Sequence, residues 1–315
     1  MTNKVEEEIK KHKNIVIARH VGPDLDALGS AISLKKAIKK KYPDKTVITP
    51  GAMPSNFSYI GKGDKELLLE DPLLIVTDTP NLERVDVQDI SRYKKIIKLD
   101  HHPIIDVFGP YDIVRTDYSS ASELIYFFLK EEGYELDKEI ATLIYMGIIC
   151  DTGRFLYAIS KYTFGVTDDL VNNYHLNLEE IYENIYMRPL DHYKLESYLT
   201  NNFEVTENGL AKIIVEEDIL NKYNASMGDI GDVINDYTHI NEFLVWVIAT
   251  YNKRTGNYKV NIRSRGPRVN LISESYCGGG HKFASGVRSI TKENVYKLFD
   301  DLDEACRSYN ENKEC

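Results

Sequence analysis

The stretch that decides the fold reads Lys94-Lys95-Ile96-Ile97-Lys98-Leu99-Asp100-His101-His102-Pro103. A short apolar run bounded by turn residues is typical of a buried strand in a parallel sheet. One carboxylate and two imidazoles follow this run at once, and all three side chains can bind a metal ion. Because ligands bind beyond the carboxyl ends of the strands in open α/β sheets, the stretch predicts a site at that edge.

The pattern on both sides of this stretch predicts two domains, because 315 residues exceed the comfortable size of a single core. Up to about Met187, strands alternate with helices, which predicts an α/β domain with a parallel sheet and helices on both faces. The expected strands cover 14–19, 46–49, 73–77 and 94–99, and the expected helices cover 26–41, 122–132, 138–149 and 178–186.

The second half of the chain has a different pattern and predicts a smaller α+β domain. Its expected strands cover 203–205, 211–216, 242–251 and 258–263, and its last helix covers 292–309. The segment Thr255-Gly256-Asn257 is typical of a hairpin turn between two of these strands. The predicted boundaries are 1–187 for the first domain, 188–199 for a linker helix region and 200–315 for the second domain.

Three further segments of the first half place metal-competent side chains directly after a strand or a helix. These side chains are His20, Asp24, Asp26, Asp78 and Asp151. Gly29 and Ser30, at the start of the following helix, allow close backbone approach and favour an anion. For the first segment alone, a structural alternative stays open, in which Asp26 is a helix N-cap and Asp24 a turn residue.

The donor types indicate the metal and the reaction. Histidine and aspartate without thiolates suit Mn²⁺, with Mg²⁺ as the alternative, and converging carboxylates would repel one another without cations. Two such ions, held about 3.5 to 4 Å apart, clamp a phosphoryl group and lower the pKa of a bound water. The predicted reaction is therefore metal-assisted hydrolysis of a phosphate ester. The four cysteines show no CxxC spacing, so neither a zinc ribbon nor a disulfide framework is indicated.

Taken together, these motifs resemble the DHH phosphoesterase superfamily, which is named for the run Asp100-His101-His102. In the second half, Arg263-Ser264 and Gly278-Gly279-Gly280-His281 resemble motifs of the DHH-associated C-terminal domain, in the subgroup of oligoribonucleases and pAp phosphatases. The resemblance implies a catalytic metal-binding domain over 1–187, a substrate-binding domain over 200–315 and an active site in the cleft between them.

The resemblance also assigns roles to single residues. One Mn²⁺ would be held by His20, Asp24 and Asp78, and the other by Asp26, Asp78, His101 and Asp151. Asp78 would then bridge both ions, His102 would lie beside the substrate phosphate, and Asp100 would orient the imidazoles by hydrogen bonding. The implied catalytic residues are Asp78, His102 and Asp100, and the implied substrate contacts are Arg263, Ser264, Gly278, Gly279, Gly280 and His281.

The C-terminal motif has a physical interpretation that agrees with this assignment. Consecutive glycines expose backbone N–H groups to an anion, and Arg263 can fork onto a phosphate. Taken alone, the same residues would fit a tight turn with solvated arginines. Two departures from the family pattern concern specificity: Cys277 stands where a further glycine is frequent, and Arg268-Val269-Asn270 stands where an aspartate-valine pair is usual.

Charge and composition limit the partners and the compartment. A net charge of −10 and a pI near 5.4 argue against a long phosphate-tracking groove, so no long duplex nucleic acid is expected. The first residues are charged where a signal peptide would be apolar, and the apolar runs are too short to span a membrane. These features predict a cytoplasmic protein without a membrane partner.

The function predicted from the motifs is hydrolysis of phosphate esters in short single-stranded oligoribonucleotides and in pAp. An alternative enzyme would cleave linear or cyclic dinucleotides such as cyclic di-AMP. An alternative of another class is a catalytically silent nucleotide-binding regulator, against which the complete donor set argues. A homodimer is compatible with the sequence. Four histidines without convergent donors are expected to be surface or locally satisfied residues; they are His12, His175, His192 and His239.

Overall fold

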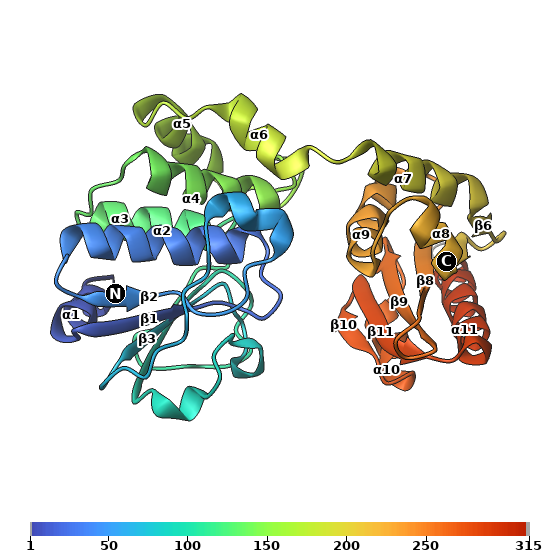
Figure 1. Cartoon of the computed structure of the whole chain (residues 1–315), viewed down its shortest axis with the longest axis horizontal. Helices are drawn as coiled ribbons and strands as arrows, with labels where there is room; N and C mark the ends of the chain where they lie inside the picture. The colour runs from blue at the N-terminus through green and yellow to red at the C-terminus, as the bar shows by residue number, and fades with distance from the viewer. Residues whose placement is uncertain (1, 313–315) are drawn as a thin grey trace. The chain divides into compact units, whose positions relative to one another are not determined.

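The computed structural model describes residues 2–312, apart from the side chain at position 55. Its contacts divide the chain after Met187 into two compact units, each with its own sheet. Figure 1 shows the first unit in blue to yellow-green and the second in yellow to red. Within the described residues, no helix has both the length and the apolar character that crossing a membrane requires.

The first unit is built on a five-stranded sheet in the order β2-β1-β3-β4-β5, in which every neighbouring pair is parallel. The strands are β1 (Asn14–Ala18), β2 (Thr46–Ile48), β3 (Leu73–Thr77), β4 (Lys95–Asp100) and β5 (Ile113–Val114). The parallel sheet predicted from the sequence is therefore confirmed. Strand β3 is buried along its whole length, as its continuous apolar sequence indicates.

The α-helices of this unit pack on one face of the sheet. Ile15 and Ile17 point into a core shared with α1, α2, α3 and α4, and both views show α2, α3 and α4 stacked together. These helices are α1 (Thr2–Lys11), α2 (Leu25–Lys41), α3 (Ala121–Glu131) and α4 (Lys138–Asp151); α5 (Thr163–Asn173) and α6 (Leu178–Tyr186) follow them. The predicted α/β class is confirmed.

The opposite face of the sheet carries shorter helices than the first. Val16 and Leu74 point to this face and pack against Val85 and Tyr93, which lie in loops beside two short 3₁₀ helices. These are η2 (Leu82–Arg84) and η3 (Ile90–Arg92), while a third, η1 (Ser55–Ile60), follows β2. On this face the helices are therefore short 3₁₀ turns, because the chain between β3 and β4 forms η2 and η3 rather than an α-helix.

The second unit contains a six-stranded mixed sheet in the order β10-β11-β9-β8-β7-β6. Its strands are β6 (Glu204–Val205), β7 (Leu210–Val215), β8 (Val245–Asn252), β9 (Asn257–Ser264), β10 (Gly279–His281) and β11 (Ala284–Ile290). Only β7 and β8 run parallel among the described pairs, and β8 and β9 form the hairpin predicted at residues 255–257.

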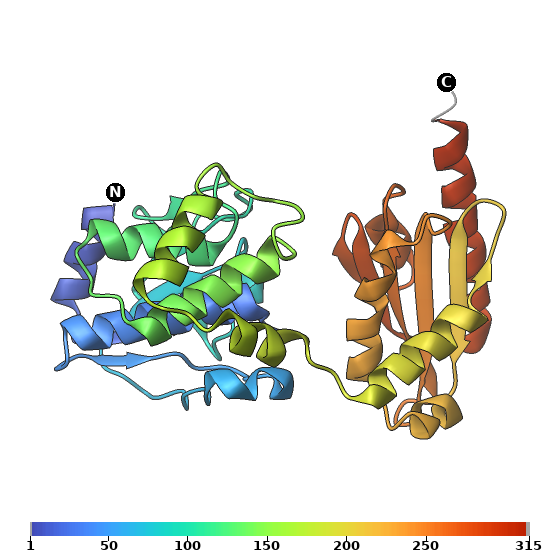
Figure 2. The ribbon, with the colours of Figure 1, turned by 90° about the horizontal axis from the view of Figure 1, so that it is seen from above.

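Helices cover both faces of this second sheet. On one face α10 (Val269–Ser275) and α11 (Lys292–Glu311) cover a core that includes Val247 and Ile262. On the other, α7 (Leu190–Asn202), α8 (Glu217–Lys222), α9 (Met227–Val233) and η4 (Ile234–His239) enclose a core around Trp246. The predicted smaller α+β domain is confirmed. Figure 2 shows α11, in red, running along the sheet.

Candidate metal centre

The carboxyl edge of the first sheet gathers all six side chains that the sequence predicts as metal ligands. His20 follows β1 by two residues, Asp78 follows β3 directly, and His101 follows β4 directly. Asp24 and Asp26 lie at the start of α2, and Asp151 is the last residue of α4. Parallel strands end at one edge of a sheet, so residues far apart in sequence meet there.

The first group of donors consists of His20, Asp24 and Asp78, whose ligand atoms all lie within 4.8 Å of one another. His20 Nε2 is 3.5 Å from Asp78 Oδ2 and 3.9 Å from Asp24 Oδ2. The other ring nitrogen, Nδ1, lies 3.1 Å from the carbonyl oxygen of Val21. An Nδ1–H that donates there leaves the Nε2 lone pair directed at the two carboxylates, which is the tautomer a metal ligand needs.

The second group consists of Asp26, His101 and Asp151. His101 Nε2 is 3.1 Å from Asp151 Oδ2, 4.0 Å from Asp26 Oδ2 and 3.5 Å from Asp78 Oδ1. Asp78 therefore faces His20 with one carboxylate oxygen and His101 with the other. Its backbone has a φ of +49°, in the left-handed region, where aspartate is less disfavoured than most residues.

Two aspartates at the start of α2 have different structural roles. Asp24 Oδ1 accepts hydrogen bonds from the backbone N–H groups of Asp26 and Ala27, so Asp24 is the N-cap of α2. The structural alternative with Asp26 as the N-cap is therefore wrong. Asp26 is fully buried and accepts from the N–H groups of Ala121 and Ser122, which belong to the first turn of α3.

Close packing of α2 against α4 holds Asp26 and Asp151 together. A Cβ at Gly29 would lie 2.5 Å from the Leu143 carbonyl oxygen, and a Cβ at Gly147 would lie 2.7 Å from Asp26 Oδ1. Ser30 is fully buried and its hydroxyl donates to Thr77 Oγ1. The predicted role of Gly29 and Ser30 in favouring an anion is therefore corrected, because both residues face the protein interior.

We expect Gly147→Ala to destabilise the protein by about 1–3 kcal/mol, although alanine is the better helix former. The new methyl group would displace Asp26 and the Ser122 hydroxyl, whose Oγ would lie 2.0 Å away. Urea unfolding of the metal-free protein measures the stability, and a Mn²⁺ titration should show weaker binding. Gly165→Ala is the matched control, because a Cβ there would point into open space among the described residues outside its own helix turn. Equal stability and equal Mn²⁺ binding for both variants would contradict the packing argument.

The electrostatics of the cluster demand positive charge. Burial raises the pKa of Asp26 well above its usual range, and the charges of Asp151 and Asp78 raise it further. Burial also acts to raise the pKa of Asp78, but His101 and His20 outweigh it and hold this pKa at about 2. For His101, burial lowers the pKa, yet Asp151 and Asp78 raise it to about 11. The carboxylates thus hold a proton on His101 when no other cation compensates them.

The residues fit a pair of metal ions. Asp78 Oδ1 and His101 Nε2 are buried, and neither makes a hydrogen bond within the described residues. Buried polar atoms without a partner are costly unless a ligand or an ion completes them. The carboxylate and imidazole donors suit Mn²⁺ or Mg²⁺ rather than a metal that prefers thiolates.

Asp100 and His102 lie beside this cluster. Asp100 is fully buried, and its Oδ1 accepts from the backbone N–H groups of His101 and His102. The same oxygen lies 2.9 Å from His102 Nδ1, which places the opposite ring nitrogen away from Asp100. The side chain of His102 is 37% exposed, whereas that of His101 is 14% exposed. Of the two imidazoles, His102 is therefore the one that an incoming substrate reaches more easily.

Two basic residues near the centre were not predicted from the sequence. Arg84 Nη2 lies 3.3 Å from His20 Nδ1. Lys98 is fully buried within β4, and its ammonium donates to the carbonyl oxygens of Pro80 and Asp106, in the loops that follow Asp78 and His102. The position of Lys98 inside an otherwise apolar strand could have indicated its role from the sequence, because a buried ammonium needs hydrogen-bond acceptors.

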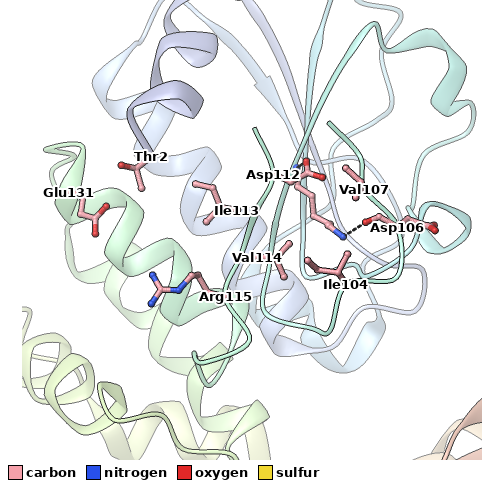
Figure 3. Close-up of a pocket in the computed structure, with 10 residues that line it drawn as sticks. Thr2, Ile104, Asp106, Val107, Asp112, Ile113, Val114, Arg115 and Glu131 are labelled. Atoms are coloured by element: carbon pink, nitrogen blue, oxygen red, sulfur yellow. Dashed lines mark hydrogen bonds between the residues drawn. The ribbon is translucent and has the colours of Figure 1, made fainter. Parts of the chain in front are cut away.

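Two cavities lie near the carboxyl edge. One of about 400 Å³ opens beside β5, with Ile104, Val107 and Val114 in its wall (Figure 3). It contains none of the six predicted ligands. The other, of about 720 Å³, is lined by His101 and Asp151 together with polar side chains such as Ser160 and Lys161. This second cavity therefore offers space for a polar ligand next to the metal donors.

The second unit brings Arg263 and His281 onto one face of its sheet. Arg263 pairs with Ala284 across β9 and β11, and Ala284 pairs with His281 across β11 and β10. Residues directly opposite in antiparallel strands project to the same side. Arg263 Nε donates to Asn235 Oδ1 at 3.0 Å, so η4 supports the guanidinium, a contact that the sequence alone did not indicate.

The other residues of the C-terminal motif have structural roles. The Ser264 hydroxyl is buried, donates to the Pro267 carbonyl and accepts from the Gly266 N–H, so its role as a substrate contact stays a prediction. Gly278 and Gly280 pack against β11 so closely that a Cβ would lie 2.4 Å and 2.6 Å from carbonyl oxygens, and only Gly279 of the three has open space. Cys277 has a φ of +59°, where glycine would be favoured.

Comparison with known proteins agrees with the description of both units. The family model of the DHH family, N-terminal domain, matches residues 14–148, and that of the DHHA1 domain matches residues 208–308. The chain is 35% identical to a probable bifunctional oligoribonuclease and PAP phosphatase NrnA of Streptococcus mutans, over 94% of this chain and 96% of that protein.

Two further comparisons also cover nearly the whole chain. A bifunctional oligoribonuclease and PAP phosphatase NrnA of Bacillus subtilis is 32% identical, over 96% of this chain and 97% of that protein. The crystal structure of an exopolyphosphatase-related protein from Bacteroides fragilis has a TM-score of 0.85 and 25% identity, covering 98% of this chain and 96% of that chain. With both domain models matched in order and with full-length relatives above 30% identity, the chain belongs to the DHH family.

Proposed function

We propose that this protein is a cytoplasmic hydrolase that cleaves phosphate esters in short oligoribonucleotides and in pAp, with two Mn²⁺ ions as cofactors. The observation that carries the proposal is the pair of donor groups that share Asp78. The names of the Streptococcus mutans and Bacillus subtilis relatives support the substrate class. Mg²⁺ is the alternative metal, because the same donors accept it.

His20, Asp24 and Asp78 would hold one ion, and Asp26, Asp78, His101 and Asp151 would hold the other. When bound, the ions would polarise the phosphoryl oxygens and lower the pKa of a bound water molecule. The chain contributes the geometry: Asp24 is oriented by its contacts with the start of α2, and Asp26 is oriented by the N–H groups of α3. The donors are therefore arranged before a substrate arrives, which lowers the cost of reorganisation.

His102 would contact the phosphate, and Asp100 would act as its positioning residue. The Nδ1 of His102 faces the buried Asp100 carboxylate, so an Nδ1–H can donate to it while Nε2 remains available to the substrate. In the second unit, Arg263 and His281 would bind a further phosphate of the nucleotide. Their shared face and the support from Asn235 favour this role.

A substrate panel tests the proposed function. The purified chain, stripped of metal and resupplied with Mn²⁺, should hydrolyse pAp and RNA of two to five nucleotides, with far lower rates on long duplex RNA. Mg²⁺ alone and metal-free protein are the controls for the cofactor. Release of AMP or mononucleotides is followed by chromatography.

The outcomes of the panel separate the candidate functions. Exclusive cleavage of cyclic or linear dinucleotides such as cyclic di-AMP would replace the proposed substrate by the alternative one. Tight binding of nucleotides without turnover under any metal would identify a silent regulator instead.

A further inference from the structure

A second group of metal-competent side chains lies in the second unit, away from the residues assigned above. It consists of His192 and Glu196 on α7 and Asp236 on η4, whose ligand atoms all lie within 4.8 Å of one another. His192 and Glu196 are four residues apart in one helix, so they project from the same side of α7. His192 Nε2 lies 3.7 Å from Asp236 Oδ2.

The environment of His192 shows that its imidazole is turned inward. Its side chain is only 8% exposed, and its Nε2 faces the Asp236 carboxylate. The ring meets the Tyr193 ring edge-on, with centroids 5.5 Å apart. An imidazole nitrogen that lies beside two carboxylates can share a cation with them. His192 thus has a local partner in Asp236, as predicted, but it also has two convergent donors that the prediction did not include.

The charge around this imidazole favours a cation. Asp229 and Asp232 lie close enough to interact electrostatically with His192, in addition to Glu196 and Asp236. Arg188 contributes one positive charge to the same neighbourhood, against four carboxylates. Asp229 is held by the capping box at the start of α9, whereas the converging ligand atoms belong to His192, Glu196 and Asp236.

We propose that His192, Glu196 and Asp236 form a binding site for one divalent transition-metal ion, for which Zn²⁺ is the best fit. An imidazole with two carboxylates suits Zn²⁺ better than Mg²⁺, which prefers oxygen ligands alone. Ligands of a tetrahedral ion at about 2.0–2.1 Å are about 3.3 Å apart, so the observed 3.7 Å needs only a small contraction. Solvent would fill the remaining coordination position.

The bound ion would join α7 to η4. The Tyr237 hydroxyl on η4 already donates to the Glu196 carbonyl oxygen at 3.0 Å, which keeps the two elements in contact without metal. The neighbouring Asn235 accepts the hydrogen bond from Arg263. The site therefore has a structural role, independent of the proposed hydrolysis, and would stabilise the segment that supports Arg263.

Metal counting on the full chain tests this site. Protein stripped with a chelator is titrated with Zn²⁺ by calorimetry, and the bound metal is counted after dialysis. His192→Gln and Glu196→Gln should each bind one Zn²⁺ fewer per chain than wild type, and should lose the part of the Zn²⁺-dependent rise in Tm that this site contributes. The use of two conservative variants guards against a folding defect in either one.

His239→Gln is the matched control, because His239 is an exposed histidine at the end of the same η4. The control should bind as many Zn²⁺ ions as wild type. Because the donors at the first sheet are present in every variant, the difference of one ion does not depend on the proposed hydrolysis. Equal metal counts for wild type, His192→Gln and Glu196→Gln would overturn the proposal. Binding of Co²⁺ offers a second readout, since loss of an imidazole ligand changes its visible spectrum.

Discussion

Asp78→Asn is expected to lower kcat/KM with Mn²⁺ by at least about 10³-fold, which corresponds to about 4 kcal/mol of transition-state stabilisation. One carboxylate faces both donor groups, with Oδ2 at 3.5 Å from His20 and Oδ1 at 3.5 Å from His101. An amide has nearly the same shape, but it offers a single neutral oxygen and cannot serve two cations. Bound Mn²⁺ should therefore fall together with activity.

The backbone should tolerate this substitution. Asparagine and aspartate are the residues, after glycine, that best accept a left-handed φ, and Asp78 has a φ of +49°. The secondary structure measured by circular dichroism should therefore be unchanged. Asp71→Asn is the matched control, because Asp71 precedes the same strand, has a φ of +41° and forms an exposed ion pair with Lys94. A variant Asp78→Asn that kept two Mn²⁺ ions and normal turnover would disprove the shared-ligand arrangement.

Arg263→Ala and His281→Ala are expected to cost about 2–4 kcal/mol of transition-state stabilisation on pAp and on di- to pentanucleotides, or about 30- to 1000-fold in kcat/KM. Each variant removes a donor for a charged phosphate from the face that Arg263 and His281 share. The generic ester bis-p-nitrophenyl phosphate should lose little rate, because it has no second phosphate for this face to bind.

The matched control for both variants is Arg288→Ala, because Arg288 is an exposed arginine on β11 of the same sheet. Mn²⁺ content should be the same in all three variants. Arg263→Ala also loses the hydrogen bond to Asn235, so the unfolding of this variant is measured together with its activity. His281→Ala tests the face that Arg263 and His281 share without the loss of that hydrogen bond. If both types of substrate lost rate equally and Mn²⁺ was released, the division of binding and chemistry between the two units would be wrong.

Local sequence patterns were sufficient for the four longer strands of the first sheet, for the helices α2, α3, α4 and α6, and for the identity of the donors. Strand β3 and helix α6 have the bounds that the apolar runs predict, because a buried strand and an amphipathic helix each leave a short-range pattern of side chains. The donors after these runs could be named for the same reason, since polar side chains that follow a buried strand stand at one edge of a parallel sheet. Strands β10 and β11 were missed, because glycine and serine within them have low strand propensity.

Contacts between distant segments could not be predicted, and they decided the roles of single residues. The sequence around Asp24 and Asp26 fits either residue as the N-cap, and only the N–H groups of α3, almost a hundred residues away, show why Asp26 is turned inward. Ser30 and Ser264 lie in polar motifs, yet both hydroxyls hydrogen-bond within the protein.

The group around His192 also depends on a contact between distant segments that the sequence did not indicate. Glu196, four residues after His192, was visible at helical spacing and could have drawn attention to it. Its third donor, Asp236, is more than forty residues away and meets it only when η4 packs near α7. The sequence by itself determined which side chains could bind a metal, because that depends on chemical type. Only the tertiary structure decided which of them share a site, because distance and burial depend on the packing of whole elements.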